Sequence, residues 1–134
     1  MKKSVAFAIA SLVWSEGLEA REQVLYCPAS IEAGSMQSAA TLPGWLLFNR
    51  SKLVLHSAAF TGGAPELMIE LVPIQISKKR GLEFERWKFD GDEVWLRCAY
   101  GKGGQVTLSK KVDGEPTECT VSYSHKLPLK IVCT

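Results

Sequence analysis

Four cysteines restrict the folds open to this chain more than any other feature of its sequence. They are Cys27, Cys98, Cys119 and Cys133, an even set in which no two are close enough to form a C-x-x-C pair. A zinc site or a redox motif requires such close pairs, so neither is expected. Two disulfides are the simplest interpretation, and they indicate an oxidising compartment.

The first twenty residues have the pattern of a secretory signal peptide. Lys2 and Lys3 give a positive start, residues 5–14 are uncharged and mostly apolar, and a polar stretch ends at Ala20. Ten residues are too few to cross a bilayer. We therefore predict cleavage after Ala20, which leaves a single β-rich domain over residues 21–134.

The mature chain is expected to be periplasmic or secreted, without a membrane anchor. Cys27 is not predicted to be a lipidated residue, because bulky side chains precede it where a lipobox requires small ones. Residues 67–76 are apolar but contain Glu70 and Pro73, so we expect them inside the protein and not inside a membrane. A net charge of +2 and only short basic clusters give no indication of a nucleic-acid partner.

The C-terminal half predicts antiparallel β structure. Apolar and polar residues alternate there in short segments separated by turn residues, at 82–89, 94–100, 105–112, 117–123 and 129–133. Asp90-Gly91 predicts a type I′ hairpin between the first two segments. The predicted fold is mainly β with little helix, a small antiparallel sheet or meander arranged as a disulfide-stapled sandwich or partly open barrel.

The N-terminal half has weaker patterns. Residues 24–31 predict a short strand broken at Pro28, residues 42–45 predict a turn, and residues 52–60 alternate weakly. Residues 67–76 predict either one buried edge strand or a strand pair kinked at Pro73.

The strand pattern leaves the pairing of the cysteines open. If residues 124–128 form a hairpin loop, Cys119 and Cys133 lie opposite each other, and Cys27 is left to bond Cys98. The rival pairing joins Cys98 to Cys119 and Cys27 to Cys133, and we favour the first only slightly. Either set stabilises the fold by roughly 2–4 kcal/mol per bridge.

No motif in the sequence indicates catalysis or the binding of a metal or cofactor. His56 is predicted to be a partly buried structural histidine, and His125 lies in an expected exposed turn. Glu83 and Glu85 alternate with apolar neighbours, which predicts the solvated face of a strand and not a glycosidase pair. Residues 90–92 match only the start of a calcium loop. We expect a protein that is not an enzyme.

Two loops and two tryptophans are candidates for contact with a partner. Loops 101–104 and 124–128 carry basic side chains that could enter a cleft, and the two tryptophans are expected to lie together around the Asp-Gly turn as an exposed strip. The candidate residues are Tyr100, Lys102, His125, Lys126, Trp87 and Trp95.

Five short motifs spread over most of the mature chain resemble those of one family. They are Cys27-Pro28-x-x-Ile31, Pro43-Gly44-Trp45, Trp95-Leu96-x-Cys98-x-Tyr100, Cys119-x-Val121 and Val132-Cys133. The family they resemble consists of small exported proteins of unassigned function from enterobacteria and other proteobacteria. The resemblance implies a periplasmic or secreted location and carries no activity, substrate or catalytic residue.

Export, small size and disulfides together favour a non-catalytic binding module that recognises an envelope or secreted protein. One specific form is a periplasmic inhibitor of lysozyme-like enzymes, although the Ser-Gly-x-x-Tyr element of one such inhibitor family is absent. The alternatives are an envelope hydrolase that uses Glu83, Glu85 or Asp92, and an accessory part of a larger assembly.

Overall fold

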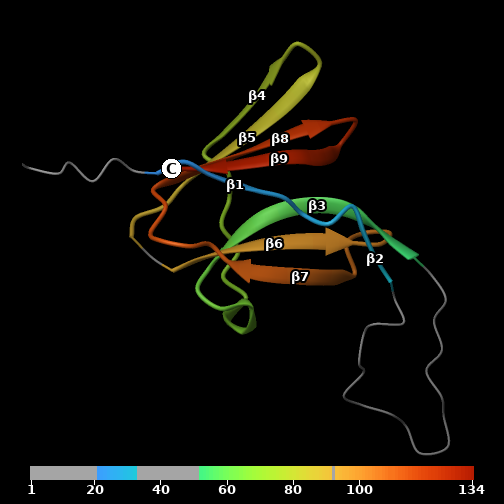
Figure 1. Ribbon diagram of the computed structural model, residues 1–134, viewed down its shortest axis with the longest axis horizontal. Coiled ribbons are helices and arrows are strands. Elements are labelled where there is room, and N and C mark those ends of the chain that lie inside the picture. The colour runs from blue at the N-terminus through green and yellow to red at the C-terminus, as the bar shows by residue number, and fades with distance from the viewer. Residues whose placement is uncertain (1–20, 33–51, 92) are drawn as a thin grey trace, which may run out of the picture.

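The computed structural model describes residues 21–32, 52–91 and 93–134, which form two β-sheets packed face to face (Figure 1). The predicted signal peptide, the expected turn at residues 42–45 and Asp92 lie outside these residues. The strands are β1 (Gln23–Leu25), β2 (Ser30–Glu32), β3 (Lys52–Gly62), β4 (Gln75–Lys79), β5 (Leu82–Lys88), β6 (Val94–Tyr100), β7 (Val106–Lys111), β8 (Glu118–Ser124) and β9 (Leu127–Cys133). A short 3-10 turn, η2 (Pro65–Leu67), follows β3.

All strand pairs in both sheets are antiparallel, as the alternating sequence pattern predicts. One sheet has the order β1-β9-β8-β5-β4 and the other has the order β2-β3-β6-β7. Side chains of β3, β5, β6, β8 and β9 enter the space between the sheets, where Phe60 packs edge-on against Trp87 and Phe89 at ring distances of 5.2 and 5.4 Å. This confirms the predicted mainly β fold.

Two chain segments connect strand β3 to the five-stranded sheet, one at each end of the strand. The first runs from β1, which pairs with β9, into β2, where Ile31 lies opposite Leu53 of β3. The second follows η2, where Leu71 N–H donates to the Phe60 carbonyl at 3.0 Å, and then continues into β4 beside β5. Both ends of β3 are thus tied to the opposite sheet.

The second crossing segment corrects the expectation that residues 67–76 are buried. Most of its side chains are exposed, to 83% for Met68 and 78% for Val72, and Ile69, Ile74 and Ile76 are also exposed, whereas Leu71 is half-buried against the core. The backbone of this segment pairs with strands at the margin of the sandwich, so the side chains project outward. The apolar sequence therefore forms a surface strip and not a core strand.

The two disulfides join Cys27 to Cys98 and Cys119 to Cys133. Cys119 and Cys133 lie directly opposite each other on β8 and β9, as the hairpin expectation requires. The other bond fastens the crossing between β1 and β2 to β6. Of the two pairings left open by the sequence, this is the one that the strand pattern slightly favoured.

The expected hairpin at Asp90-Gly91 is not formed. Gly91 does adopt a left-handed conformation, with φ of 84°, but β5 pairs with β4 and β8, whereas β6 pairs with β3 and β7. The turn therefore carries the chain from one sheet to the other. A turn sequence fixes a change of direction, and only the packing of both sheets decides which strands become neighbours.

Candidate interaction surface

Three connections lie around one end of the sandwich, two of them on the right of Figure 1 and the β4–β5 turn at its top. They are the β4–β5 turn at Arg80-Gly81, the β6–β7 loop at residues 101–105, and the β8–β9 turn at His125-Lys126. The start of β3 lies beside the second and third of these connections. Side chains from both sheets therefore gather here although their strands are far apart in sequence.

Two adjoining hollows lie between these connections. The larger, of about 490 Å³, is lined by the start of β3, by Lys102 of the β6–β7 loop and by Lys126 of the β8–β9 turn. The smaller, of about 240 Å³, lies between the β4–β5 and β8–β9 turns and is lined by residues that include Lys78, Glu83 and His125. Lys126 contributes to both hollows, so they adjoin each other at this side chain.

This surface, which we call the lysine-rich end, carries a concentrated positive charge. Its cationic side chains are Lys52, Lys78, Lys102 and Lys126, with His56 and His125 among them. The carboxylate among its described lining residues is that of Glu83, which lies 3.4 Å from the Lys78 ammonium nitrogen. The net positive charge of this small area exceeds the +2 of the whole chain.

The turn that carries Lys126 has an unfavourable backbone conformation. His125 and Lys126 both have positive φ angles, of 50° and 67°, because Ser124 and Leu127 pair directly and leave a two-residue loop. Type I′ turns of this kind strongly favour Asn-Gly, because glycine has no Cβ and asparagine tolerates a positive φ, whereas most other residues are strained there. The β4–β5 turn shows the usual solution, with a glycine at its second position.

Three of the six predicted contact residues lie together at the lysine-rich end, namely Lys102, His125 and Lys126. Their side chains are exposed. The sequence did not indicate that Lys52, His56 and Lys78 would join them. His56 in particular is exposed, which corrects the expectation of partial burial: it lies at a register irregularity between β3 and β6, and its ring lies beside Gly104.

Trp87 and Tyr100 are not surface residues. Trp87 is 2% exposed, and its indole N–H donates to the Leu71 carbonyl at 3.4 Å, so it anchors the exposed strip from inside. Tyr100 is fully buried, and burial raises the pKa of its phenol. Within the described part of the chain, its hydroxyl has no hydrogen-bond partner. Both residues therefore belong to the core.

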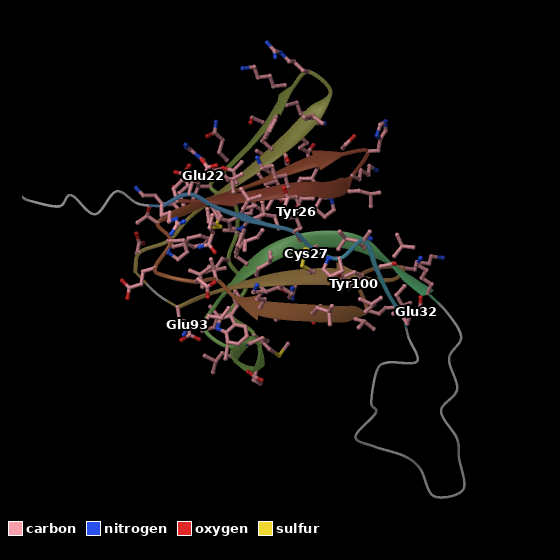
Figure 2. The ribbon with its side chains drawn as sticks, viewed as in Figure 1. Glu22, Tyr26, Cys27, Glu32, Glu93 and Tyr100 are labelled. Carbon is pink, nitrogen blue, oxygen red and sulfur yellow. A yellow bond between two sulfur atoms is a disulfide. The ribbon has the colours of Figure 1, made fainter. Side chains whose placement is uncertain are left out.

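Trp95 lies on the outer face of the other sheet, away from Trp87, so the expected aromatic strip does not exist. Its indole N–H donates to Glu93 Oε1 at 2.6 Å, and Lys111 donates to Glu93 Oε2 at 2.8 Å. These hydrogen bonds, first from Lys111 and then from Trp95, lower the pKa of Glu93. Figure 2 shows Glu93 and Tyr100 at opposite ends of β6, so this cluster is remote from the lysine-rich end.

Glu83 and Glu85 correct another expectation. They lie on the same face of β5 as the buried Trp87, and this face turns toward the other sheet. The Tyr123 hydroxyl oxygen lies 2.8 Å from the Ala58 carbonyl oxygen and 3.0 Å from Glu85 Oε2, which links the two sheets. Burial, and next the charge of Glu85, raise the pKa of Tyr123. Glu85 therefore has a structural partner.

In the part of the chain that the structure describes, no group of three or more His, Cys, Asp or Glu side chains is arranged to hold a metal ion. Within the same residues, no helix has the length and apolar character needed to cross a membrane.

A family model matches residues 50–134, which include every strand from β3 to β9. Its description is type VI secretion system Tli immunity protein. The chain belongs to the Tli immunity protein family. No curated protein matches the chain, and no solved structure does. The Tli match covers the lysine-rich end and the exposed strip, whereas Cys27 and the resembling motifs at Cys27-Pro28 and Pro43-Gly44-Trp45 precede it.

Proposed function

We propose that this chain is an immunity protein that binds a type VI secretion effector outside the cytoplasm and thereby blocks it. The observation that carries the proposal is the match to the Tli immunity family over residues 50–134. The function is inhibition by binding, which agrees with the non-catalytic binding module expected from the sequence.

The covalent structure supports action in the periplasm. Cys27–Cys98 and Cys119–Cys133 are disulfides, and such bonds form and persist in oxidising compartments. The N-terminal pattern of Lys2, Lys3 and the apolar stretch that follows would direct export, with cleavage after Ala20 releasing a mature domain of residues 21–134. An effector delivered to the periplasm would meet the immunity protein there.

The state of the acidic residues supports binding in preference to hydrolysis. Glu83 lies within ion-pair distance of Lys78, and Glu85 lies within hydrogen-bond distance of Tyr123. Both carboxylates therefore have partners within the fold. An inhibitor of lysozyme-like enzymes is one specific form of the proposed function, and it applies if the effector degrades the cell wall.

A competition experiment tests the function. A strain that lacks this gene is grown with its parent, whose type VI secretion system is active, and survival of the mutant is counted. We expect the mutant to be killed, and we expect it to survive beside a parent whose secretion system is disabled. Equal survival in both mixtures would contradict the proposal.

Three complementing forms of the protein test the location. The full chain should restore survival, whereas a variant that lacks residues 2–20 should not, because it would remain in the cytoplasm without disulfides. A third variant, exported by an unrelated signal peptide fused before Arg21, separates export from any direct role of the first twenty residues. Rescue by the cytoplasmic variant would contradict a periplasmic site of action.

A further inference from the structure

We propose that the effector binds at the lysine-rich end and presents an acidic segment there, with Lys102 and Lys126 as the central contacts. This inference rests on the proposed immunity function and adds to it the binding surface and the chemistry of the partner. It makes the β8–β9 turn the element that meets the effector first.

The charge distribution is the first argument. Lys52, Lys102 and Lys126 converge on one hollow from β3, the β6–β7 loop and the β8–β9 turn, and no carboxylate lies among the described residues that line it. Lys102 and Lys126, from two separate elements, repel each other in the free protein, whereas Lys52 lies directly opposite Glu32 of β2. An acidic segment placed among them removes that repulsion and replaces it with attraction.

The shape of the surface is the second argument. The two hollows adjoin across Lys126, and together they give the end of the sandwich a concave face. The larger hollow, of about 490 Å³, also has apolar side chains in its lining, from Leu53, Leu55 and Leu127. A protruding loop with a carboxylate and an apolar neighbour fits this combination better than a flat polyanion does.

The strained turn is the third argument. Holding His125 and Lys126 in left-handed conformations destabilises the fold, whereas Asn-Gly at the same place would not. Strain of this kind concentrates at functional sites, where particular side chains are needed in a particular place. Of the two side chains that this turn presents, Lys126 lines both hollows and His125 lines the smaller one.

The exposed apolar strip of residues 67–76 is the rival surface, because Met68 and Val72 are the kind of side chains that interfaces bury. It has a hollow of its own, of about 310 Å³, lined by Gly62, Gly63, Ile69, Leu71 and Glu93, but the charged side chain of that lining, Glu93, is already paired with Lys111 within the fold. The lysine-rich end also provides long-range attraction, which speeds the capture of an acidic partner. We therefore assign the effector to the lysine-rich end.

The experiment begins with the effector itself. The oxidised domain of residues 21–134 is used to capture protein from the culture medium of the strain with its secretion system active, and again with that system disabled. A protein captured only from the first medium is the effector. Its affinity for purified variants of the domain is then measured at low and at moderate salt concentration, after thermal unfolding has shown that each variant is folded.

Three double variants are compared. Lys102→Glu/Lys126→Glu reverses the charge of the hollow and keeps a non-glycine residue in the turn. Lys88→Glu/Lys110→Glu is the matched control, because it changes the net charge equally at exposed positions outside the lining of both hollows. Met68→Ser/Val72→Ser tests the rival surface.

We expect the first variant to bind the effector at least about tenfold more weakly and with less dependence on salt, and the control to stay within about threefold of the unchanged domain. Equal binding by the first variant and the control would overturn the inference, and so would loss of binding confined to the Met68/Val72 variant. In both cases the immunity function would stand. If the unchanged domain bound anionic vesicles or DNA as tightly as it binds the effector, the inference would also be overturned. Failure to capture any secretion-dependent protein would instead contradict the proposed function itself, and the inference with it.

Discussion

Replacing the β8–β9 turn by Asn-Gly should make the protein more stable and a weaker binder. A left-handed conformation costs an ordinary L-residue roughly 1–2 kcal/mol. Glycine at position 126 relieves this cost but loses about 0.5–1 kcal/mol through the greater freedom of the unfolded chain, and asparagine at position 125 gains a few tenths because it tolerates the conformation. We therefore expect His125→Asn/Lys126→Gly to raise the free energy of unfolding by about 1 kcal/mol.

The gain is measurable by thermal unfolding of the oxidised domain, where about 1 kcal/mol corresponds to about 4 °C in a domain of this size. Affinity for the effector should fall in the same variant, because both side chains leave the lysine-rich end. Lys126→Ala is the control: it keeps a strained residue in the turn, so its stability should be unchanged while its affinity falls.

An unchanged or lower midpoint for the Asn-Gly variant would refute the strain argument, since the turn would then be held by contacts that the geometry does not reveal. Full affinity in that variant would refute the role of the turn in binding. The two readouts are independent, so either part of the reasoning can fail alone.

Further predictions concern the cross-links and the buried phenol. Loss of the Cys27–Cys98 bond, which closes 71 residues, should lower the free energy of unfolding by about 4 kcal/mol, and loss of Cys119–Cys133, which closes 14, by about 3 kcal/mol, as measured by urea titration of alanine pairs. The reverse order would contradict the loop-closure reasoning. Tyr123→Phe should cost about 1–2 kcal/mol, because the link from Ala58 to Glu85 is lost. Folding raises the pKa of Tyr123, so its contribution is full below the unfolded value of about 10 and is lost as pH rises above it. The phenylalanine variant should therefore lose less stability than the unchanged protein between about pH 9 and pH 11, and an equal loss would contradict this assignment.

Much of the strand content could be predicted because the C-terminal strands alternate cleanly. The pattern from Leu82 onward gave segments that match β5 to β9 to within about two residues. The partners of these strands could not be predicted. Asp90-Gly91 has the sequence of a hairpin turn, but β5 and β6 lie in different sheets and contribute to one core between them, and that depends on the packing of both sheets.

The segment at residues 67–76 was misjudged for a related reason. Its composition is that of a core strand, yet its backbone completes the margin of two sheets and most of its side chains have no layer above them. Hydrophobicity alone does not distinguish a segment that is buried from one that lies on the surface.

The candidate surface was predicted in part. Lys102, His125 and Lys126 stand in turns, so their exposure follows from local sequence. Lys52 and His56 lie close to these turn residues because β3 pairs with β6, which brings distant parts of the chain together. Trp87 was misplaced because alternation separates two faces of a strand without saying which face meets the second sheet. Tyr100 was misplaced because it was grouped with the loop that follows it, although alternation puts it on the apolar face of Leu96 and Cys98.

The bond between Cys27 and Cys98 has a consequence for how the domain can be trimmed. The family match begins at residue 50, after Cys27, so a fragment cut to the matching region holds three cysteines. Cys119 and Cys133 would still form their disulfide across the β8–β9 hairpin, but Cys98 would be left with a free thiol. The start of β3 would also lose its neighbour β2. Such a fragment offers both a reactive sulfur and an open strand edge, the two features that let one chain become joined to another.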